Sequence, residues 1–173
     1  MNTIELNPDF SAWAAGAGYA IFHAPGSVTI ANDGGEIRFT ITAADRTIAL
    51  ERAERAEEPR LLMTSPEMNA IERMLIDYVG DDLRSTRNLG HVFFPFDWRE
   101  CAPGYAVIDF GDRWTGLSRL GRPMDLRIRD RDYLHPAVMY SYIADADPVA
   151  LMQSYSDPVG APLLRNFVSP PRR

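Results

Sequence analysis

The first apolar residues of the chain recur at the spacing of an α-helix. Asn7 and Pro8 are typical of a helix start, because Asn caps the first turn and Pro occupies a position whose N–H has no helical partner. Apolar residues then stand three or four positions apart, at Phe10, Trp13, Ala14 and Ala17. Gly16 or Gly18 is expected to end the helix. The pattern predicts a short amphipathic helix near the N-terminus.

From residue 19 onward, apolar residues alternate with polar ones, which is the period of a β-strand. The segments with this alternating or β-branched character are 19–23, 27–30, 36–41, 47–51 and 60–64. Residues that favour turns, such as Pro25-Gly26 and Asn32-Asp33-Gly34-Gly35, stand between them. We therefore expect an antiparallel β-meander.

A long helix is expected after the last of these strands. Ser65 is interpreted as its capping residue, Pro66 lies in the first turn, and Glu67 suits the positive end of the helix dipole. Apolar residues follow at helical spacing, at Met68, Ile71, Leu75, Tyr78 and Val79. The main helix is predicted to run from about Pro66 to Leu83.

The second half of the chain has fewer regular patterns. An aromatic run at 92–98 is expected to form a loop or a short extended segment, because Pro95 interrupts both regular structures. The elements predicted beyond it are a strand at 105–110, a weaker strand at 124–128, and helices at 134–144 and 149–155. The tail after about residue 160 is expected to be irregular. Residues 1–173 are therefore predicted to form a single α+β domain.

Composition restricts the possible partners. A chain of 173 residues and 19.4 kDa can bury roughly 70% of its surface without disulfides or a structural metal. Its 24 acidic and 18 basic residues give a net charge of −6, which argues against nucleic acid or an anionic membrane as the main partner. All 18 basic residues are arginine, so lysine chemistry is excluded. An acidic surface suits a basic protein partner instead.

The single cysteine and the N-terminal region indicate where the protein works. Cys101 cannot form an internal disulfide, which fits a reducing cytoplasm. Residues 11–32 lack Asp, Glu and Arg, but the acidic Glu5 and Asp9 precede them, whereas a secretory signal begins with positive charge. We expect a cytoplasmic protein that does not associate with membranes.

No catalytic, metal-binding or cofactor site is predicted. The three histidines, His23, His91 and His135, lack the spacing of a helical metal pair. Neither a serine nucleophile elbow nor a dinucleotide-binding glycine motif is present.

One cluster of acids leaves an enzymatic alternative open. Carboxylates near predicted strand ends could form a hydrolytic or metal-binding cluster with His135; they are Asp109, Asp112, Asp130 and Asp132. The arginines interleaved with them are Arg113, Arg127, Arg129 and Arg131. This interleaving favours solvated ion-pair networks over a catalytic cluster.

Two irregular segments favour protein recognition over catalysis. Aromatic, arginine and glycine residues gather there, and Trp, aromatic and Arg side chains in rigid loops dominate protein-binding hot spots. The candidate partner-binding residues are Phe94, Phe96, Trp98, Asp112, Arg113 and Trp114. Trp114 is expected to be an exposed anchor in the loop that follows the strand at 105–110. The competing interpretation is that these aromatics cover the core.

The order of motifs resembles a family of actinobacterial immunity proteins. That family includes the antitoxin of the tuberculosis necrotizing toxin, an NAD glycohydrolase. The resemblance rests on the F-x-x-W-A-x-x-A-G-Y segment at 10–19, the Gly34-Gly35-Glu36-Ile37-Arg38 turn into a strand, and the closing segment Ser156-Asp157-Pro158-Val159-Gly160-Ala161-Pro162-Leu163. It implies a cytoplasmic, non-enzymatic α+β protein that binds a toxin domain and covers its NAD-binding cleft. The matching positions have the character of fold determinants.

Three functional hypotheses follow from the sequence. The first is an immunity protein that inhibits a cognate secreted toxin by covering its substrate cleft. The alternative is a small hydrolase or phosphate-ester enzyme that uses Asp109, Asp112 and His135 as acid, base or metal ligands. The third is a binding module with an unrelated partner, which only a pull-down separates from the first.

Overall fold

The computed structural model describes residues 4–131 and 134–169. Four helices and one nine-stranded antiparallel sheet are found in this part of the chain. The helices are α1 (Pro8–Ala15), α2 (Met68–Thr86), α3 (Pro136–Ser141) and α4 (Pro148–Ser156). The strands are β1 (Tyr19–Ala24), β2 (Ser27–Asn32), β3 (Ile37–Ala44), β4 (Thr47–Glu54), β5 (Arg60–Ser65), β6 (Tyr105–Gly111), β7 (Trp114–Arg119), β8 (Arg122–Pro123) and β9 (Arg127–Arg129).

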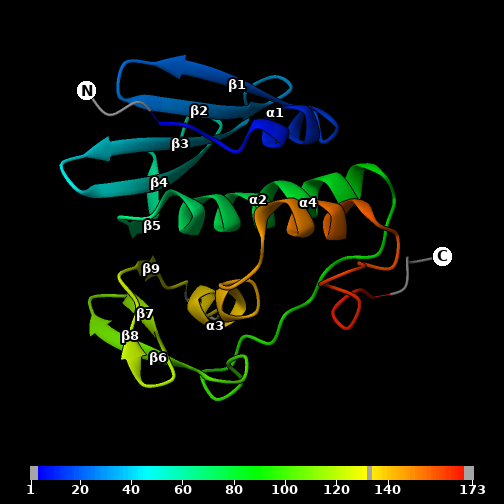
Figure 1. Cartoon of the computed structure of the whole chain (residues 1–173). Helices are drawn as coiled ribbons and strands as arrows, with labels where there is room; N and C mark the ends of the chain where they lie inside the picture. The colour runs from blue at the N-terminus through cyan, green and yellow to red at the C-terminus, as the bar shows by residue number, and fades with distance from the viewer. Residues whose placement is uncertain (1–3, 132–133, 170–173) are drawn as a thin grey trace.

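The sheet runs along one side of the molecule and the helices lie against it. Its strand order is β1-β2-β3-β4-β5-β9-β7-β6, with β8 paired to β7. In Figure 1, α2 and α4 run side by side across the middle, α1 lies above them, and α3 lies nearer to β6–β9. This arrangement confirms the predicted α+β class, with a β-meander, a short N-terminal helix, a central helix and helices near the C-terminus.

Strand register explains why one face of the sheet is apolar. Leu50 of β4 lies opposite Met63 of β5, and Met63 lies opposite Ile128 of β9. Residues that pair across antiparallel strands project from the same face, so the three side chains form one row. All three are almost completely buried. This row faces α2, whose Ile71, Leu75, Val79 and Leu83 are also buried.

Two helices begin with the capping residues that their sequences provide. The Asn7 side chain accepts a hydrogen bond from the Asp9 N–H at 2.9 Å at the start of α1. Asp147 accepts from the Ala150 N–H at 2.9 Å at the start of α4. In each case a proline occupies the first turn, where a missing N–H costs nothing.

The start of α2 differs from the prediction. The helix begins at Met68, Glu67 is its N-cap, and no side chain caps it, so the assignment of Ser65 as the cap is wrong. Ser65 is the buried last residue of β5. Its hydroxyl accepts from the Glu67 N–H and donates to the Asp125 carbonyl, both at 3.1 Å. It therefore fixes the turn between strand and helix.

Sequence patterns in the second half were less accurate. The helix expected at 134–144 shortens to Pro136–Ser141, and the strand expected at 124–128 becomes Arg127–Arg129. The segment from Trp114 is strand β7, because β6 and β9 pair with it from both sides. Gly116 permits this pairing: a Cβ there would lie 2.6 Å from the Phe110 ring and 2.9 Å from the Leu126 carbonyl.

Helices α2 and α4 approach closely because of one glycine. A Cβ on Gly80 would lie 2.3 Å from the ring of Tyr155, which is completely buried. Only glycine leaves room for that ring inside α2. Within residues 4–131 and 134–169, no helix combines the length and apolar character that crossing a membrane requires.

Candidate partner-binding groove

The sheet opens between β5 and β9. These strands pair only at Met63 with Ile128 and at Thr64 with Arg127, so the earlier residues of β5 have no strand beside them on that side in the described part of the chain. The opening is a groove of about 630 Å³. Its described lining consists of Arg52, Glu54, Arg60, Leu61, Leu62, Arg113, Arg129, Asp130 and Arg131. We call it the arginine groove.

Arg52 occupies a position that the strand pattern would assign to the core. It follows Leu50 by two residues on β4 and lies opposite Phe39, so its side chain projects from the apolar face. Its guanidinium lies 5.9 Å from the ring centroids of both Phe39 and Tyr78. An ion pair with Glu54 completes its contacts, and the Arg52 side chain is 16% exposed. Cation–π contacts therefore hold this charge at the groove.

Tyr78 also contacts a second arginine of the groove. The Arg131 guanidinium lies 5.7 Å from the Tyr78 ring centroid and donates a hydrogen bond to the Tyr78 hydroxyl at 3.2 Å. Burial raises the pKa of Tyr78, although the nearby Arg131 lowers it. The hydroxyl therefore stays neutral at physiological pH, and the ring orients two guanidinium groups, those of Arg52 and Arg131.

The turn between β6 and β7 forms one end of the groove. Asp112 and Arg113 have φ angles of 51° and 65°, in the left-handed region that hairpin turns of this length use. The Arg113 carbonyl accepts from the Asp130 N–H at 2.8 Å, which ties the turn to the end of β9. Arg113 therefore has a fixed backbone position beside the groove.

Trp114 is not in an exposed loop, so that expectation is wrong. It is the first residue of β7, it is half-buried, and it pairs with Arg129 of β9. The Arg129 guanidinium lies 5.2 Å from its ring centroid. Because of this cross-strand pairing, Trp114 is a strand residue whose ring contacts an arginine of the groove, and it is not a loop anchor.

The aromatic loop reaches the same region through His135. The Trp98 ring meets the His135 ring edge-on at 5.0 Å, and His135 Nδ1 lies 3.4 Å from a carboxylate oxygen of the groove residue Asp130. Trp98 is 38% exposed and Phe96 is 51% exposed. Trp98 is thereby connected to the groove by direct contacts.

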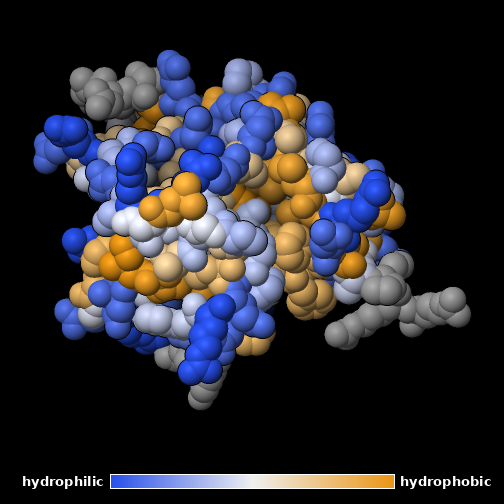
Figure 2. All heavy atoms as spheres, turned by 60° about the horizontal axis from the view of Figure 1, so that its bottom comes forward, coloured by the Kyte–Doolittle hydropathy of each residue, from blue (hydrophilic) through white to orange (hydrophobic). Residues whose placement is uncertain are grey.

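Phe94 belongs to the core instead. It is only 6% exposed, stacks on Tyr142 with ring centroids 5.7 Å apart, and contacts Phe167 at 4.9 Å. Phe94 is thus the one buried ring of the aromatic run, since Phe93 before it is 61% exposed and Phe96 and Trp98 after Pro95 are also exposed. Figure 2 shows that apolar residues form separate patches among polar ones on the face that comes forward from the bottom of Figure 1.

The residues of the enzymatic alternative are held in separate interactions. Asp109 accepts a hydrogen bond from the Gly111 N–H at 2.8 Å and is exposed on β6. Asp112 lies in the hairpin turn, whereas His135 pairs with Asp130. Asp132 lies outside the described residues. Within them, no group of three or more His, Cys, Asp or Glu side chains is arranged to hold a metal ion.

Another arginine, Arg84, joins α2 to α4 on the side of the molecule away from the arginine groove. Arg84 of α2 is completely buried and donates hydrogen bonds to five backbone carbonyls. The acceptors and distances are Gly90 at 2.5 Å, Ser154 at 3.4 Å, Tyr155 at 3.2 Å, Asp157 at 2.7 Å and Pro158 at 3.0 Å. Two of these carbonyls belong to the last turn of α4, where helical acceptors lack partners, and two belong to the residues that follow it. Arg84 therefore caps α4 from α2.

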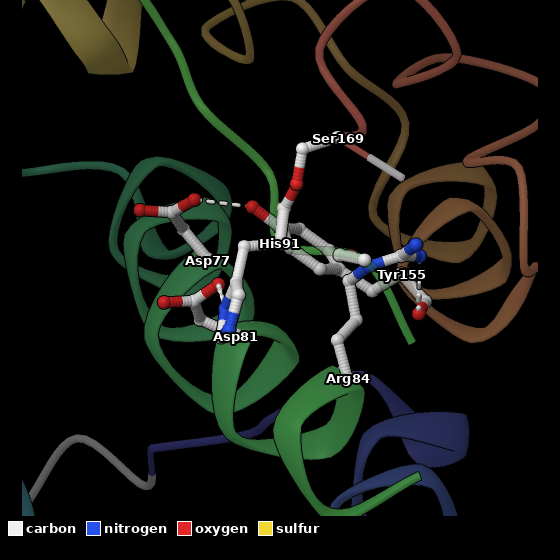
Figure 3. Close-up of polar contacts among 7 residues, drawn as sticks. Asp77, Asp81, Arg84, His91, Tyr155 and Ser169 are labelled. Atoms are coloured by element: carbon white, nitrogen blue, oxygen red, sulfur yellow. Dashed lines mark hydrogen bonds and ion pairs between the residues drawn. The ribbon is translucent and has the colours of Figure 1, made fainter. Parts of the chain in front are cut away.

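Two carboxylates of α2, those of Asp77 and Asp81, lie on one side of this region, next to Tyr155 and His91 (Figure 3). Asp77 accepts a short hydrogen bond from the Tyr155 hydroxyl, and Asp81 lies 3.7 Å from His91 Nδ1. Burial raises the pKa of Asp77 to about 6, against the opposing effect of the Tyr155 hydrogen bond. We call Asp77, Asp81, Arg84, His91 and Tyr155 the closing cluster. It joins α2, α4 and the loop after α2.

Comparison with known proteins identifies the family. Residues 13–163 match the model of the family described as Immunity protein 61. The chain belongs to this family. The protein named immunity factor for TNT from Mycobacterium tuberculosis is 24% identical over 168 residues, which cover 92% of this chain and 93% of that protein. A homolog of that factor from Mycobacterium bovis matches with the same identity and coverage.

A solved structure shows the same fold. Rv3902c from M. tuberculosis has a TM-score of 0.76 to this Immunity protein 61 chain at 24% identity, with 95% of each chain covered. The closing segment Ser156–Leu163 contributes to that fold here, because Arg84 binds the carbonyls of Asp157 and Pro158. The Asp157 carboxylate also accepts from the Val159 and Ala161 N–H groups, at 2.9 and 3.0 Å.

Sequence reasoning missed most of the groove of this Immunity protein 61 chain. Arg52 and Arg60 were not singled out, although an arginine two residues after Leu50 in an alternating strand was a usable signal. The alternation of arginines and acids after residue 126 predicts ion-pair networks. Among the described residues, however, Arg129 and Arg131 contact the aromatic residues Trp114 and Tyr78 rather than carboxylates.

Proposed function

We propose that this chain is a non-enzymatic immunity protein that inhibits a cognate toxin of the NAD glycohydrolase type by covering its substrate cleft. The observation that carries the proposal is the match of residues 13–163 to the Immunity protein 61 family. The names of the two mycobacterial relatives support the toxin type, since both are immunity factors for TNT or a homolog of one. Its free cysteine, Cys101, fits action in the reducing cytoplasm.

The contact surface that we propose is the rim of the arginine groove together with the aromatic loop beside it. Asp112, Arg113 and the half-buried Trp114 lie at the β6–β7 end of the groove, Trp98 reaches it through His135, and the exposed Phe96 lies two residues before Trp98. Aromatic and arginine side chains with restricted freedom lose little entropy on binding, which makes them effective contact residues. Phe94 is left out because the core already covers it.

The hydrolase alternative has less support than inhibition by binding. A catalytic acid or base must reach a shared reacting atom, and Asp109 and His135 are engaged in different contacts. A binding module with an unrelated partner has no observation in its favour that the family match does not explain better.

Residual toxin activity tests the proposal directly. The purified full chain is mixed with candidate NAD glycohydrolase toxin domains, and NAD hydrolysis is followed as the molar ratio rises. We expect hydrolysis to stop near equimolar addition, because a steric inhibitor acts by occupying one site. Undiminished hydrolysis at molar excess with every candidate toxin would reject the proposal.

The contact surface has its own test. Trp114→Ala should weaken toxin affinity by about 2 kcal/mol per folded molecule, since it removes a ring at the rim. The matched control is Phe22→Ala, which removes an exposed ring from β1, at the opposite end of the strand order. Equal toxin affinities for the two variants would show that the rim is not part of the interface. The proposal that the protein inhibits the toxin would still stand.

A further inference from the structure

The arginine groove concentrates positive charge on an acidic protein. The chain carries a net charge of −6, yet five of its 18 arginines line this one opening. Only two carboxylates, those of Glu54 and Asp130, face them in the described lining. Glu54 pairs with Arg52, and Asp130 accepts a long hydrogen bond from the Thr115 hydroxyl at 3.4 Å and lies 3.4 Å from His135 Nδ1. An anionic group entering the groove therefore meets a local excess of guanidinium groups.

The guanidinium groups are held in place by contacts that leave hydrogen-bond donors available. Tyr78 orients Arg52 through its ring and Arg131 through its ring and its hydroxyl, and the Trp114 ring orients Arg129. An aromatic ring that stacks on the face of a guanidinium leaves most of its five N–H donors without an acceptor, because these donors lie in the guanidinium plane. Arg52 Nη1 pairs with Glu54, whereas its Nε is buried and has no hydrogen-bond acceptor among the described residues. Planar forks held in this way match carboxylates.

The backbone on one side of the groove suits an extended chain. Beside the groove, β5 is paired with β4 on one edge, whereas its pairing with β9 on the other edge is confined to Met63 and Thr64. An unpaired strand edge can hydrogen-bond an incoming extended segment. Leu61 and Leu62 also line the groove and offer apolar contact. A compact phosphate would use the arginines but neither of these features.

We infer that the arginine groove binds an extended acidic segment of the toxin, a step that rests on the proposed immunity function. The acidic remainder of the surface attracts a basic partner at long range, and the positive groove fixes the orientation in which the partner docks. Complementary charge of this kind sets register and partner choice more than raw affinity.

Two double variants of the full chain test this inference. Arg60→Gln/Arg129→Gln removes two charges from the groove, and both residues are exposed. The control, Arg46→Gln/Arg87→Gln, removes two charges from exposed positions outside it. Circular dichroism and thermal unfolding verify that each variant is folded. We expect the groove variant to require at least about tenfold more protein for half-inhibition of the toxin, and the control less than about threefold more.

A peptide experiment identifies the chemistry of the occupant. A labelled peptide of six glutamates is titrated against the wild type and both double variants, with a six-glutamine peptide and inorganic pyrophosphate as the other probes. We expect saturable binding of the glutamate peptide to the wild type and to the control, and loss of binding in the groove variant. The glutamine peptide should not bind, because it lacks charge.

The outcomes separate this inference from the proposed function. If the wild type inhibits no toxin, the proposed function fails and this inference fails with it. If the wild type inhibits and the two double variants inhibit equally well, the function stands and the acidic segment is rejected. Binding of pyrophosphate without binding of the glutamate peptide also rejects it, in favour of a small phosphorylated ligand.

Discussion

Arginine has opposite roles on the two sides of this molecule. In the closing cluster, Arg84 is completely buried and its N–H groups are directed at five backbone carbonyls. In the arginine groove, Arg52, Arg129 and Arg131 rest against aromatic rings at an open surface. A guanidinium whose donors are all used stabilises the fold, whereas one that is oriented but still has donors available can bind a partner.

The difference also shows why a sequence motif need not mark a functional site. The closing segment that resembles the immunity family supplies carbonyls to Arg84 and a carboxylate that binds its own backbone. These contacts maintain the path of the chain after α4. The groove arginines come from several strands and one turn, so no single stretch of sequence carries them.

The largest effect is expected from Arg84→Met. It removes the donors of five carbonyls inside the protein, so we expect the free energy of unfolding to fall by about 3–5 kcal/mol. Denaturant titration measures this loss. Arg84→Lys is the matched control, because it keeps the positive charge but lacks the several N–H donors of the planar guanidinium. Its free energy of unfolding should lie between those of the wild type and Arg84→Met. A loss below about 1 kcal/mol for Arg84→Met would contradict the structural role of the closing cluster.

Leu75→Ala probes the core on which both regions rest. Leu75 is completely buried on α2, so its truncation should cost roughly 2–5 kcal/mol by chemical denaturation. Ser65→Ala is the comparison and should cost about 1 kcal/mol, because two hydrogen bonds of a buried hydroxyl are lost. A larger loss for Ser65→Ala would show that the turn before α2 contributes more to stability than the buried side chain of Leu75.

Asp77→Asn tests the closing cluster through pH. Burial raises the Asp77 pKa to about 6 in the folded protein, above the ordinary value of 3.8 for this carboxyl group. The folded state therefore holds this proton more tightly, and the stability that it contributes is present near pH 4 and lost as the pH rises through 6. The unfolding free energy of the wild type relative to Asp77→Asn should fall by about 2–3 kcal/mol between pH 4 and pH 7.

The same titration on Asp97→Asn provides the control for this pH dependence. Asp97 is exposed in the aromatic loop, and its replacement removes the same formal charge. Subtracting its profile isolates the contribution of the buried position. Identical profiles for the two variants would show that Asp77 is not desolvated in solution.

The smallest effect on stability is expected in the groove. Arg60→Gln alters an exposed side chain at the start of β5, so the free energy of unfolding should change by less than about 0.5 kcal/mol. Thermal unfolding measures it beside Arg84→Met. A loss as large as that of Arg84→Met would abolish the distinction between an arginine that holds the fold and one that is available for binding.

Local chemistry alone determined two helix caps and the β-meander of the first half. Asn7 and Asp147 cap their helices through their own neighbours, and the alternating residues of 19–51 form strands joined by short turns. These contacts join residues close in sequence, so residue type and spacing are sufficient to predict them. The net charge and the absence of lysine were likewise fixed by the sequence.

Tertiary structure alone decided the groove. β5 finds its second neighbour in β9, more than sixty residues later in the chain, and the two strands separate after two residue pairs. Trp114 became a strand residue because β6 and β9 pair with it, and Arg52 points toward Tyr78 because α2 crosses that face. Long-range strand pairing determines which side chains come into contact. The spacing of residues along the chain does not predict that pairing.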